Sequence, residues 1–217
     1  MNKIDTKENI SYSPSIEGSI KNLPLYKLKS INYELISDNY TNIVFQSAAA
    51  VEFFQHHHIL NEKKIYSMGK STSLSLLEKG LISKSPDIPG SDGIIKLIEN
   101  RIGAGRSLVV KGKGGLNEIY NYLKYRNLKV DQVCCYERRE LDNYDILKDD
   151  FLSADAVIFP STLAVKIFFK EIYSEGVKTK FFGISNRIVT FINDSGYEGI
   201  LIDYFSNDLE EQIEKFT

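Results

Sequence analysis

Short apolar runs alternate along the chain with amphipathic stretches and glycine-containing turns. This is the pattern of βα units around a parallel sheet. The apolar runs predict strands at 23–31, 43–45, 65–68, 107–111, 129–136, 156–159, 181–182 and 199–203. The amphipathic stretches predict helices at 47–56, 72–79, 94–101, after the turn 112–115 to about 126, at 162–173, at 186–194 and from 207 onward. We therefore expect an α/β protein.

One motif occurs twice, about half a chain length apart. Residues 43–51 read IVFQSAAAV and residues 157–165 read VIFPSTLAV. In each copy a second apolar run follows and ends in glycine, at Gly69 and Gly183. The serine-to-glycine spacing is the same in both copies, 69 − 47 = 22 and 183 − 161 = 22. We infer two related α/β units, and we expect the ligand to bind between them.

A charged stretch, 137–150, separates the two halves, and the C-terminal half has too few strands for a sheet of its own. We therefore expect the N-terminal segment to complete it. The predicted architecture is two flavodoxin-like lobes with parallel sheets, joined by a two-stranded linker. The predicted domains are a discontinuous lobe of residues 1–28 plus 140–217 and a second lobe of residues 29–139, with crossings near 25–31 and 136–142.

Composition excludes several classes of function. The net charge of −2 provides no bulk attraction for nucleic acid or an anionic membrane. No apolar run approaches the roughly 18 residues of a membrane span, and the polar N-terminus lacks a signal peptide's apolar core. We expect a cytoplasmic monomer that binds a small molecule, with neither nucleic acid nor membrane as a partner.

Ser47 and Ser161 each end a predicted strand and begin a helix, where serine is a favoured N-cap. Such helix starts leave backbone N–H groups and the positive end of the helix dipole at the carboxyl edge of the sheet, which suits carboxylates or phosphates. The turns at 69–72 and 183–186, which include Thr72, Ser185 and Asn186, repeat this arrangement. Any single one is more often an ordinary cap, so the prediction of an anion site rests on their number and pairing.

The turn formed by Lys111, Gly112 and Lys113 could also approach an anion, since glycine permits close backbone contact and the lysines add charge. A flexible, solvated turn is the alternative interpretation. The sequence Gly69-Lys70-Ser71 is not a phosphate-binding loop, because position 64, where that motif needs glycine, is Lys64.

His56, His57 and His58 are consecutive and cannot converge on one metal from a helix. Cys134 and Cys135 alternate across a strand, which favours core packing for at least one of them. We therefore predict no metal, no cofactor and no Cys–His nucleophile. Tyr136 ends the same strand, and its phenol could donate a proton to a leaving group. Taken alone, it would be interpreted as a packing residue.

Together these elements resemble the uroporphyrinogen-III synthase family over residues 23–217, in order and spacing. The resemblance implies two α/β lobes, a two-stranded linker and no cofactor. The matching elements are Phe45-Gln46-Ser47 with Ala50-Val51, Gly69 with Thr72 and Gly80, Val109 to Gly115, Val133 to Tyr136, Phe159-Pro160-Ser161 with Ala164-Val165, Gly183, and Phe205 to Lys215.

The resemblance also implies the reaction, in which hydroxymethylbilane loses water and cyclises to uroporphyrinogen III. Departure of its hydroxyl gives an azafulvene, and the far pyrrole ring attacks through its substituted carbon. The resulting spiro intermediate reopens and closes with that ring inverted. Tyr136 matches the tyrosine proposed to assist the leaving hydroxyl, Thr72 a cleft threonine, and Ser47 and Ser161 the strand-end serines.

Two departures from the family pattern stand out. Ser185 and Asn186 lie where the family often has a threonine pair. Only 22 residues precede Leu23, where family members have a strand, a full helix and a second strand, and Gly18 interrupts the candidate helix 15–21. The alternative function is a non-catalytic homologue that binds a tetrapyrrole or another polyanion. A two-lobed sugar- or amino-acid-binding module is disfavoured, because the sequence shows no export signal and no aromatic-lined motif.

Overall fold

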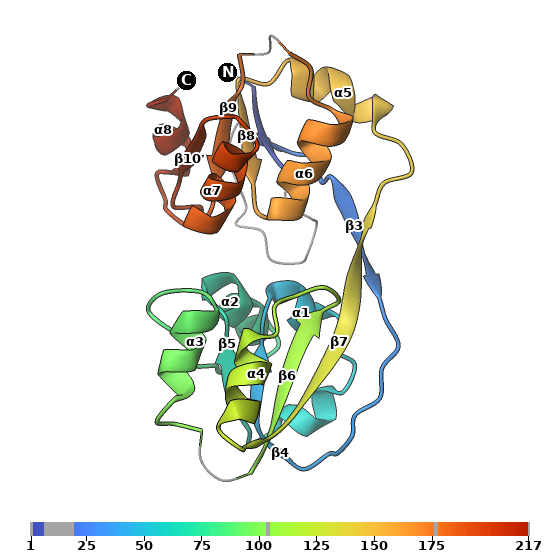
Figure 1. Cartoon of the computed structure of the whole chain (residues 1–217), viewed down its shortest axis with the longest axis vertical. Coiled ribbons are helices and arrows are strands. Elements are labelled where there is room, and N and C mark those ends of the chain that lie inside the picture. Colours follow the sequence, from blue (N-terminus) through green and yellow to red (C-terminus); the bar gives the residue numbers. More distant parts are fainter. Residues whose placement is uncertain (1, 7–19, 103–104, 176–177, 217) are drawn as a thin grey trace. The chain divides into compact units, whose positions relative to one another are not determined.

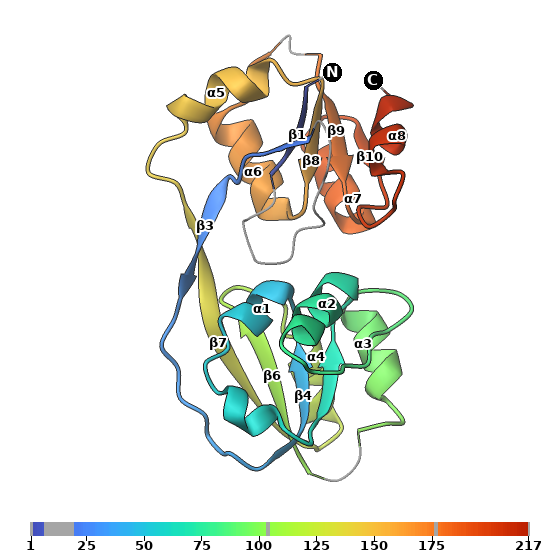
Figure 2. The same ribbon diagram turned by 180° about the vertical axis from the view of Figure 1, so that it is seen from behind.

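The computed structural model describes residues 2–6, 20–102, 105–175 and 178–216. Contacts divide the chain into two compact units (Figures 1 and 2). Unit 1 comprises the described N-terminal residues up to Lys27 together with the chain from Arg139 onward, and unit 2 comprises Leu28–Arg138. Each unit has its own five-stranded sheet, so the predicted class of two α/β lobes with parallel sheets is confirmed.

The sheet of unit 1 has the strand order β10-β9-β8-β1-β2, and every neighbouring pair is parallel. Counted along the chain this is the order 2-1-3-4-5 of flavodoxin-like folds. The strands are β1 (Lys3–Asp5), β2 (Ile20–Asn22), β8 (Ala156–Phe159), β9 (Lys180–Gly183) and β10 (Gly199–Leu201), and the helices are α5 (Asp145–Leu152), α6 (Thr162–Glu171), α7 (Asn186–Asp194) and α8 (Leu209–Glu214).

Unit 1 contains an N-terminal strand that the sequence pattern missed. Strand β1 pairs with both β2 and β8, so the N-terminal segment does complete this sheet. Lys3 and Asp5 are buried because each has a polar partner: Lys3 Nζ lies 2.7 Å from a Glu214 carboxylate oxygen, and Tyr204 donates to Asp5 at 2.5 Å. The candidate helix 15–21 is wrong at its C-terminal end, which belongs to β2, and residues 15–19 lie outside the described residues.

The sheet of unit 2 has the strand order β3-β7-β6-β4-β5, in which β7, β6, β4 and β5 pair in parallel. Strands β3 and β7 are hydrogen-bonded neighbours and both cross from one unit to the other, which confirms the two-stranded linker. The strands are β3 (Tyr26–Ser30), β4 (Tyr40–Phe45), β5 (Lys64–Ser67), β6 (Arg106–Gly112) and β7 (Lys129–Glu140), and the helices are α1 (Ala48–Glu52), the 3-10 helix η1 (His57–Leu60), α2 (Lys70–Glu78), α3 (Ser91–Ile98) and α4 (Glu118–Tyr125).

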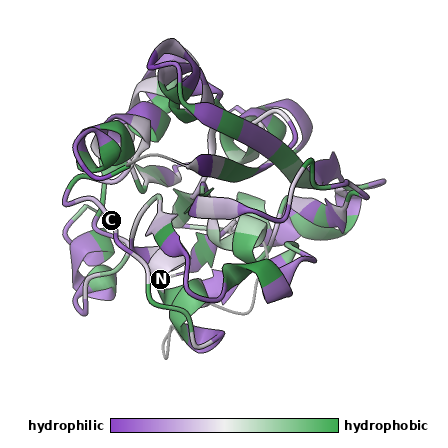
Figure 3. Ribbon diagram, turned by 90° about the horizontal axis from the view of Figure 1, so that it is seen from below, coloured by the Kyte–Doolittle hydropathy of each residue, from purple (hydrophilic) through white to green (hydrophobic). Residues whose placement is uncertain are grey.

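Helices cover both faces of the unit 2 sheet. Helices α1, η1 and α2 pack with Phe45, Val110 and Cys135 on one face. Helices α3 and α4 pack with Val44 and Val109 on the other. Neighbouring strand residues therefore enter opposite cores, as the alternation of a strand requires. The hydropathy colouring of Figure 3 shows apolar and polar segments within single helices, as expected for helices with only one side against a sheet.

One helix was predicted too long, and one charged stretch contains regular structure that was not predicted. The predicted helix 47–56 is too long, because α1 stops at Glu52; His56 is the N-cap of η1, and His57 and His58 are its first residues. The charged stretch 137–150 was expected to be a separator, yet it contains the end of β7 and most of α5. Helix α5 contributes Phe151 to the core, where its ring packs edge-on against Phe168 at 5.5 Å. Phe151 therefore holds α5 against the core, although the charged residues of this segment gave no sign of a packed helix.

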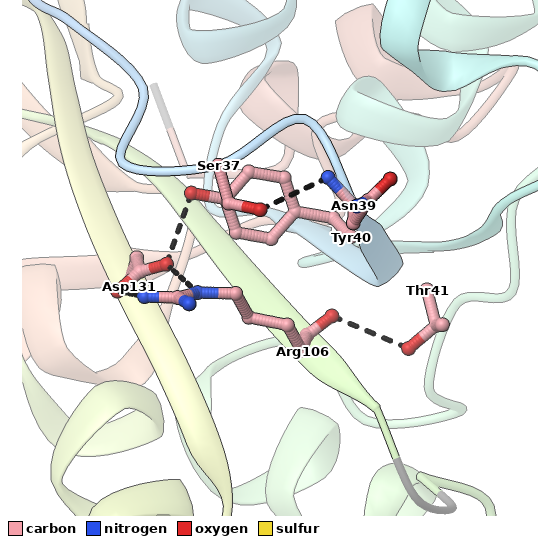
Figure 4. A network of polar contacts seen from close by, with 6 residues as sticks. All are labelled: Ser37, Asn39, Tyr40, Thr41, Arg106 and Asp131. Atoms are coloured by element: carbon pink, nitrogen blue, oxygen red, sulfur yellow. Dashed lines mark hydrogen bonds and ion pairs between the residues drawn. The ribbon is translucent and has the colours of Figure 1, made fainter.

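At the amino ends of its strands, unit 2 has a partly buried ionic network (Figure 4). Arg106 binds both oxygens of Asp131, one of them from Nη2 at 3.1 Å, and the Tyr40 hydroxyl donates to the same carboxylate at 3.0 Å. Burial alone would raise the pKa of Asp131, but the hydrogen bonds from Arg106 and Tyr40 hold it below its usual value. Burial and the Asp131 hydrogen bond together raise the pKa of Tyr40 to about 12.

Replacing Asp131 by asparagine is expected to destabilise the protein at pH 7, with the effect fading in acid. A carboxyl whose folded-state pKa is depressed contributes stability above its unfolded pKa, near 3.9, and loses that contribution as the pH falls through the folded value. Urea unfolding of both proteins at pH 7 and below about pH 3 measures this. A difference in midpoint that is the same at both pH values would contradict the assignment.

Candidate functional site

The candidate site of unit 2 is built on Ser47, the N-cap of α1. Its backbone is extended (φ −162°, ψ 161°), and its Oγ accepts a hydrogen bond from the Ala50 N–H at 3.0 Å. The same Oγ lies 2.9 Å from the hydroxyl oxygen of Tyr136 on β7. Two predicted site residues, separated by 89 positions in the sequence, therefore share a hydrogen bond.

Tyr136 reaches Ser47 by passing over Gly112. Strand β6 lies between β4 and β7, and Gly112 ends β6 directly beside Tyr136, after a register shift in the pairing. A Cβ at position 112 would lie 2.5 Å from Cζ and 2.8 Å from the hydroxyl oxygen of Tyr136. Only glycine, which has no side chain, leaves room at position 112 for the Tyr136 ring. Gly112 was predicted to approach an anion, and the structure shows it making room for the phenol ring.

The place where these residues meet favours ligand binding. Ser47 follows β4, and Gly112 ends the neighbouring strand β6. From β4 the chain connects to β5 on one side of this strand pair, and from β6 it connects to β7 on the other side. The carboxyl ends of two such strands form the switch point of a doubly wound sheet, where ligands of this architecture bind. The Ser47–Tyr136 pair lies at the switch point of unit 2.

Two further side chains fix the Tyr136 ring. Phe53 stacks on it with ring centroids 5.8 Å apart and an interplanar angle of 27°. Arg138, two positions further along β7, has its guanidinium carbon 5.6 Å from the ring centroid, and its Nη2 lies 3.4 Å from the phenol oxygen. Sequence reasoning missed Arg138. Its spacing of two from Tyr136 along a strand, which places both on one face, is the signal that could have found it.

Unit 1 repeats the serine–tyrosine arrangement. Ser161, the N-cap of α6, has nearly the same backbone angles as Ser47 (φ −155°, ψ 154°) and accepts from the Ala164 N–H at 3.2 Å. Its Oγ lies 3.1 Å from the hydroxyl of Tyr26, the first residue of β3. The internal repeat thus extends to the tyrosine partners, each of which comes from a strand of the linker. Tyr26 was not among the predicted site residues.

The Lys111 ammonium group binds the protein's own oxygen atoms and does not face solvent. The side chain is buried (3% exposed), and its Nζ donates to the carbonyl oxygens of Gly115 and Leu116, at 2.5 and 3.0 Å, and to Asn117 Oδ1 at 2.5 Å. Burial lowers its pKa. Because the ammonium binds three oxygens of the turn that follows β6, the structure assigns Lys111 a role in holding that turn.

Backbone N–H groups of the same turn are also engaged. The Lys113 N–H donates to the Tyr136 carbonyl at 2.7 Å, and the Gly115 N–H donates to the Gly112 carbonyl at 3.1 Å. The Lys113 side chain is 69% exposed and lies 3.3 Å from a Glu137 carboxylate oxygen. Two N–H groups of the turn therefore bind within the protein, and the exposed Lys113 ammonium is paired with Glu137.

Thr72 and Asn186 occupy matching places in the repeat but not in the structure. Each lies three residues after its glycine, Gly69 or Gly183. Helix α2 begins directly after Gly69, so Thr72 lies in its first turn and is buried (2% exposed). Helix α7 begins two residues later, with Ser185 as its N-cap, so Asn186 is its exposed first residue. The Ser185 hydroxyl makes no capping hydrogen bond to the helix.

The other candidate chemistries find no support in the described parts of the chain. Burial raises the pKa of Cys135 to about 12, and its thiol lies 3.5 Å from the Ala50 carbonyl oxygen, so it is not a reactive thiolate. Among the described residues, no group of three or more His, Cys, Asp or Glu side chains could hold a metal ion. Within the same residues, no helix has the length and apolar character needed to cross a membrane.

Comparison with known proteins gives the family. The sequence model of the uroporphyrinogen-III synthase HemD family matches residues 20–203. The structure is similar to that of uroporphyrinogen-III synthetase from Helicobacter pylori, with a TM-score of 0.69, 15% identity and 99% of each chain covered. It is also similar to a mutant uroporphyrinogen III synthase from Thermus thermophilus, with a TM-score of 0.58, 12% identity, and 91% of this chain and 88% of that chain covered. No curated protein matches the sequence. Because the family model matches most of the chain, this protein belongs to the uroporphyrinogen-III synthase family, whose activity is that of a lyase.

Proposed function

We propose that Tyr136 supplies the proton with which this chain converts hydroxymethylbilane into uroporphyrinogen III. The observation that carries the proposal is the 2.9 Å hydrogen bond between Tyr136 and Ser47 at the switch point of unit 2. A phenol is a competent general acid, and it is one of the few titratable groups positioned there by specific contacts. Phe53, Gly112 and Arg138 fix its orientation before substrate arrives.

In the proposed mechanism the protein assists one bond cleavage and then controls geometry. Protonation of the terminal hydroxyl lets the C–O bond break and water leave, which generates the azafulvene in its protonated, cationic form. The far ring then attacks and inverts through the spiro intermediate. Ring closure releases one proton from a pyrrole carbon, which balances the proton donated to the leaving hydroxyl. Holding the two ends of a flexible substrate together accounts for the rest of the rate gain.

The substrate carries eight carboxylates, and we propose half-buried and exposed groups at helix starts and turns as their partners. Ser161 begins α6, and Ser185 and Asn186 begin α7, each a helix long enough to bind an anion through its N-terminal N–H groups and dipole. Lys113 adds an exposed ammonium in unit 2. Lys111 and Gly112 contribute by holding the turn and admitting the phenol ring. Thr72 contributes through packing at the start of α2.

We further propose that the protein works as a cytoplasmic monomer without a nucleic-acid or membrane partner. The net charge of −2 supports the absence of nucleic-acid and anionic-membrane partners, because it supplies no bulk attraction for either. We also propose that residues 1–28 plus 140–217 and residues 29–139 are separate folding domains. Separate sheets, each with its own helical layers, support that division.

Product analysis tests the function. Purified protein with hydroxymethylbilane is expected to give the type III isomer, whereas spontaneous closure gives type I. Binding of hydroxymethylbilane without any change in the isomer distribution would instead establish the non-catalytic homologue. A reaction mixture without protein provides the rate and isomer distribution of the spontaneous reaction.

A further inference from the structure

The two hydroxyls of the Ser47–Tyr136 pair differ in exposure. Tyr136 is 2% exposed, with its ring enclosed by Phe53 and by the passage over Gly112. Ser47 is half-buried, at the point where β4 ends and the chain turns into α1. A substrate that approaches the carboxyl end of the sheet can therefore reach the Ser47 hydroxyl more readily than the phenol oxygen behind it.

Either hydroxyl of the pair could be the donor, and the surrounding hydrogen bonds allow donation from Tyr136 to Ser47. Arginine can only donate, so the 3.4 Å contact between Arg138 Nη2 and the phenol oxygen uses one acceptor position of Tyr136. Ser47 Oγ already accepts from the Ala50 N–H at 3.0 Å, and a hydroxyl oxygen has two acceptor positions. If Tyr136 donates to Ser47, both positions of Ser47 are filled by protein donors, and the serine proton is directed to a partner outside the pair.

We propose that Ser47 is a catalytic residue that passes the proton of Tyr136 to the leaving hydroxyl. The inference rests on the proposed function of Tyr136. In one concerted movement Ser47 O–H gives its proton to the substrate hydroxyl, Tyr136 O–H gives its proton to Ser47, and the C–O bond breaks with release of water. Tyr136 remains as a phenolate beside the Arg138 guanidinium. The proton released on ring closure returns through Ser47 to Tyr136, which balances the cycle.

Two substitutions separate the relay from the capping role of Ser47. Asparagine caps a helix as well as serine does but has no hydroxyl to pass a proton, whereas threonine keeps the hydroxyl. The relay predicts that S47N lowers kcat about a hundredfold, the lower range of general acid catalysis, while S47T stays within about tenfold of the parent protein. Thermal unfolding of both variants verifies that the fold is retained.

A proton inventory of kcat in mixtures of H₂O and D₂O supplies a readout that a structural role would not change. The relay predicts a curved plot, because two exchangeable protons move in the same step, and no further loss of kcat when S47N is added to Y136F. Normal turnover by S47N, or a linear inventory in the parent protein, would overturn the relay while leaving the proposed function intact. Failure of the parent protein to form the type III isomer would overturn both.

Discussion

Replacement of Tyr136 by phenylalanine is expected to lower kcat for hydroxymethylbilane by about a hundredfold or more. The change removes one hydroxyl and keeps the ring that stacks on Phe53 and lies over Gly112. The loss should therefore report on proton donation rather than on packing. A positioned general acid contributes typically 10²- to 10⁴-fold to a rate. Initial rates of type III product formation, corrected for spontaneous closure, measure the effect.

Tyr125 provides the matched control, because its side chain is 85% exposed at the end of α4. Y125F makes the same chemical change at a site remote from the pair and should leave kcat unchanged. A rate loss in Y136F smaller than about tenfold, which corresponds to roughly 1.4 kcal/mol in the barrier, would remove Tyr136 as the principal acid.

Gly112→Ala is expected to reduce kcat to about the level of Y136F, although it leaves every polar group in place. The added Cβ would meet the phenol ring at 2.5 Å, so either the ring or the end of β6 must move. Either movement separates Tyr136 from Ser47. Inserting a methyl into so tight a contact should also cost about 1–3 kcal/mol of stability. Steady-state kinetics together with urea unfolding measure both effects.

The double variant tests whether Gly112 acts through Tyr136. In a Y136F background the phenol oxygen is already absent, so G112A should lower stability again but reduce kcat little further. Independent, multiplicative losses of kcat would mean that Gly112 serves catalysis by another route. Full activity in G112A alone would show that the ring path over β6 is not needed.

The sequence repeat could predict the position of Ser47 and Ser161, because both depend on local rules. An apolar strand followed by serine and a helix fixes an N-cap whatever the surroundings, and both caps adopt the expected extended backbone. The positions of most strands follow from similar reasoning about βα units, and β1 and β2 escaped it. Lys3 and Asp5 looked polar, and their burial depends on Glu214 and Tyr204, about 200 positions away.

The roles of Lys111 and Gly112 could not be predicted in the same way. Both were interpreted from residue type, as a charge and a flexible backbone facing an anion. In the structure Lys111 binds oxygens of its own turn, and Gly112 gives way to a ring from the neighbouring strand. These functions depend on a register shift in the β6–β7 pairing, which no local pattern encodes. The roles of Lys111 and Gly112 therefore depend on contacts with neighbouring strands and turns, and not on residue type alone.

In the proposed mechanism Tyr136 assists hydroxyl departure and does not select the isomer. The most direct test is the isomer distribution from Y136F at enzyme concentrations where bound turnover exceeds spontaneous closure. We expect slow formation of type III product, because the ring inversion depends on how the substrate is held. Type I product from the bound substrate, or type III product at the rate of the parent protein, would contradict it.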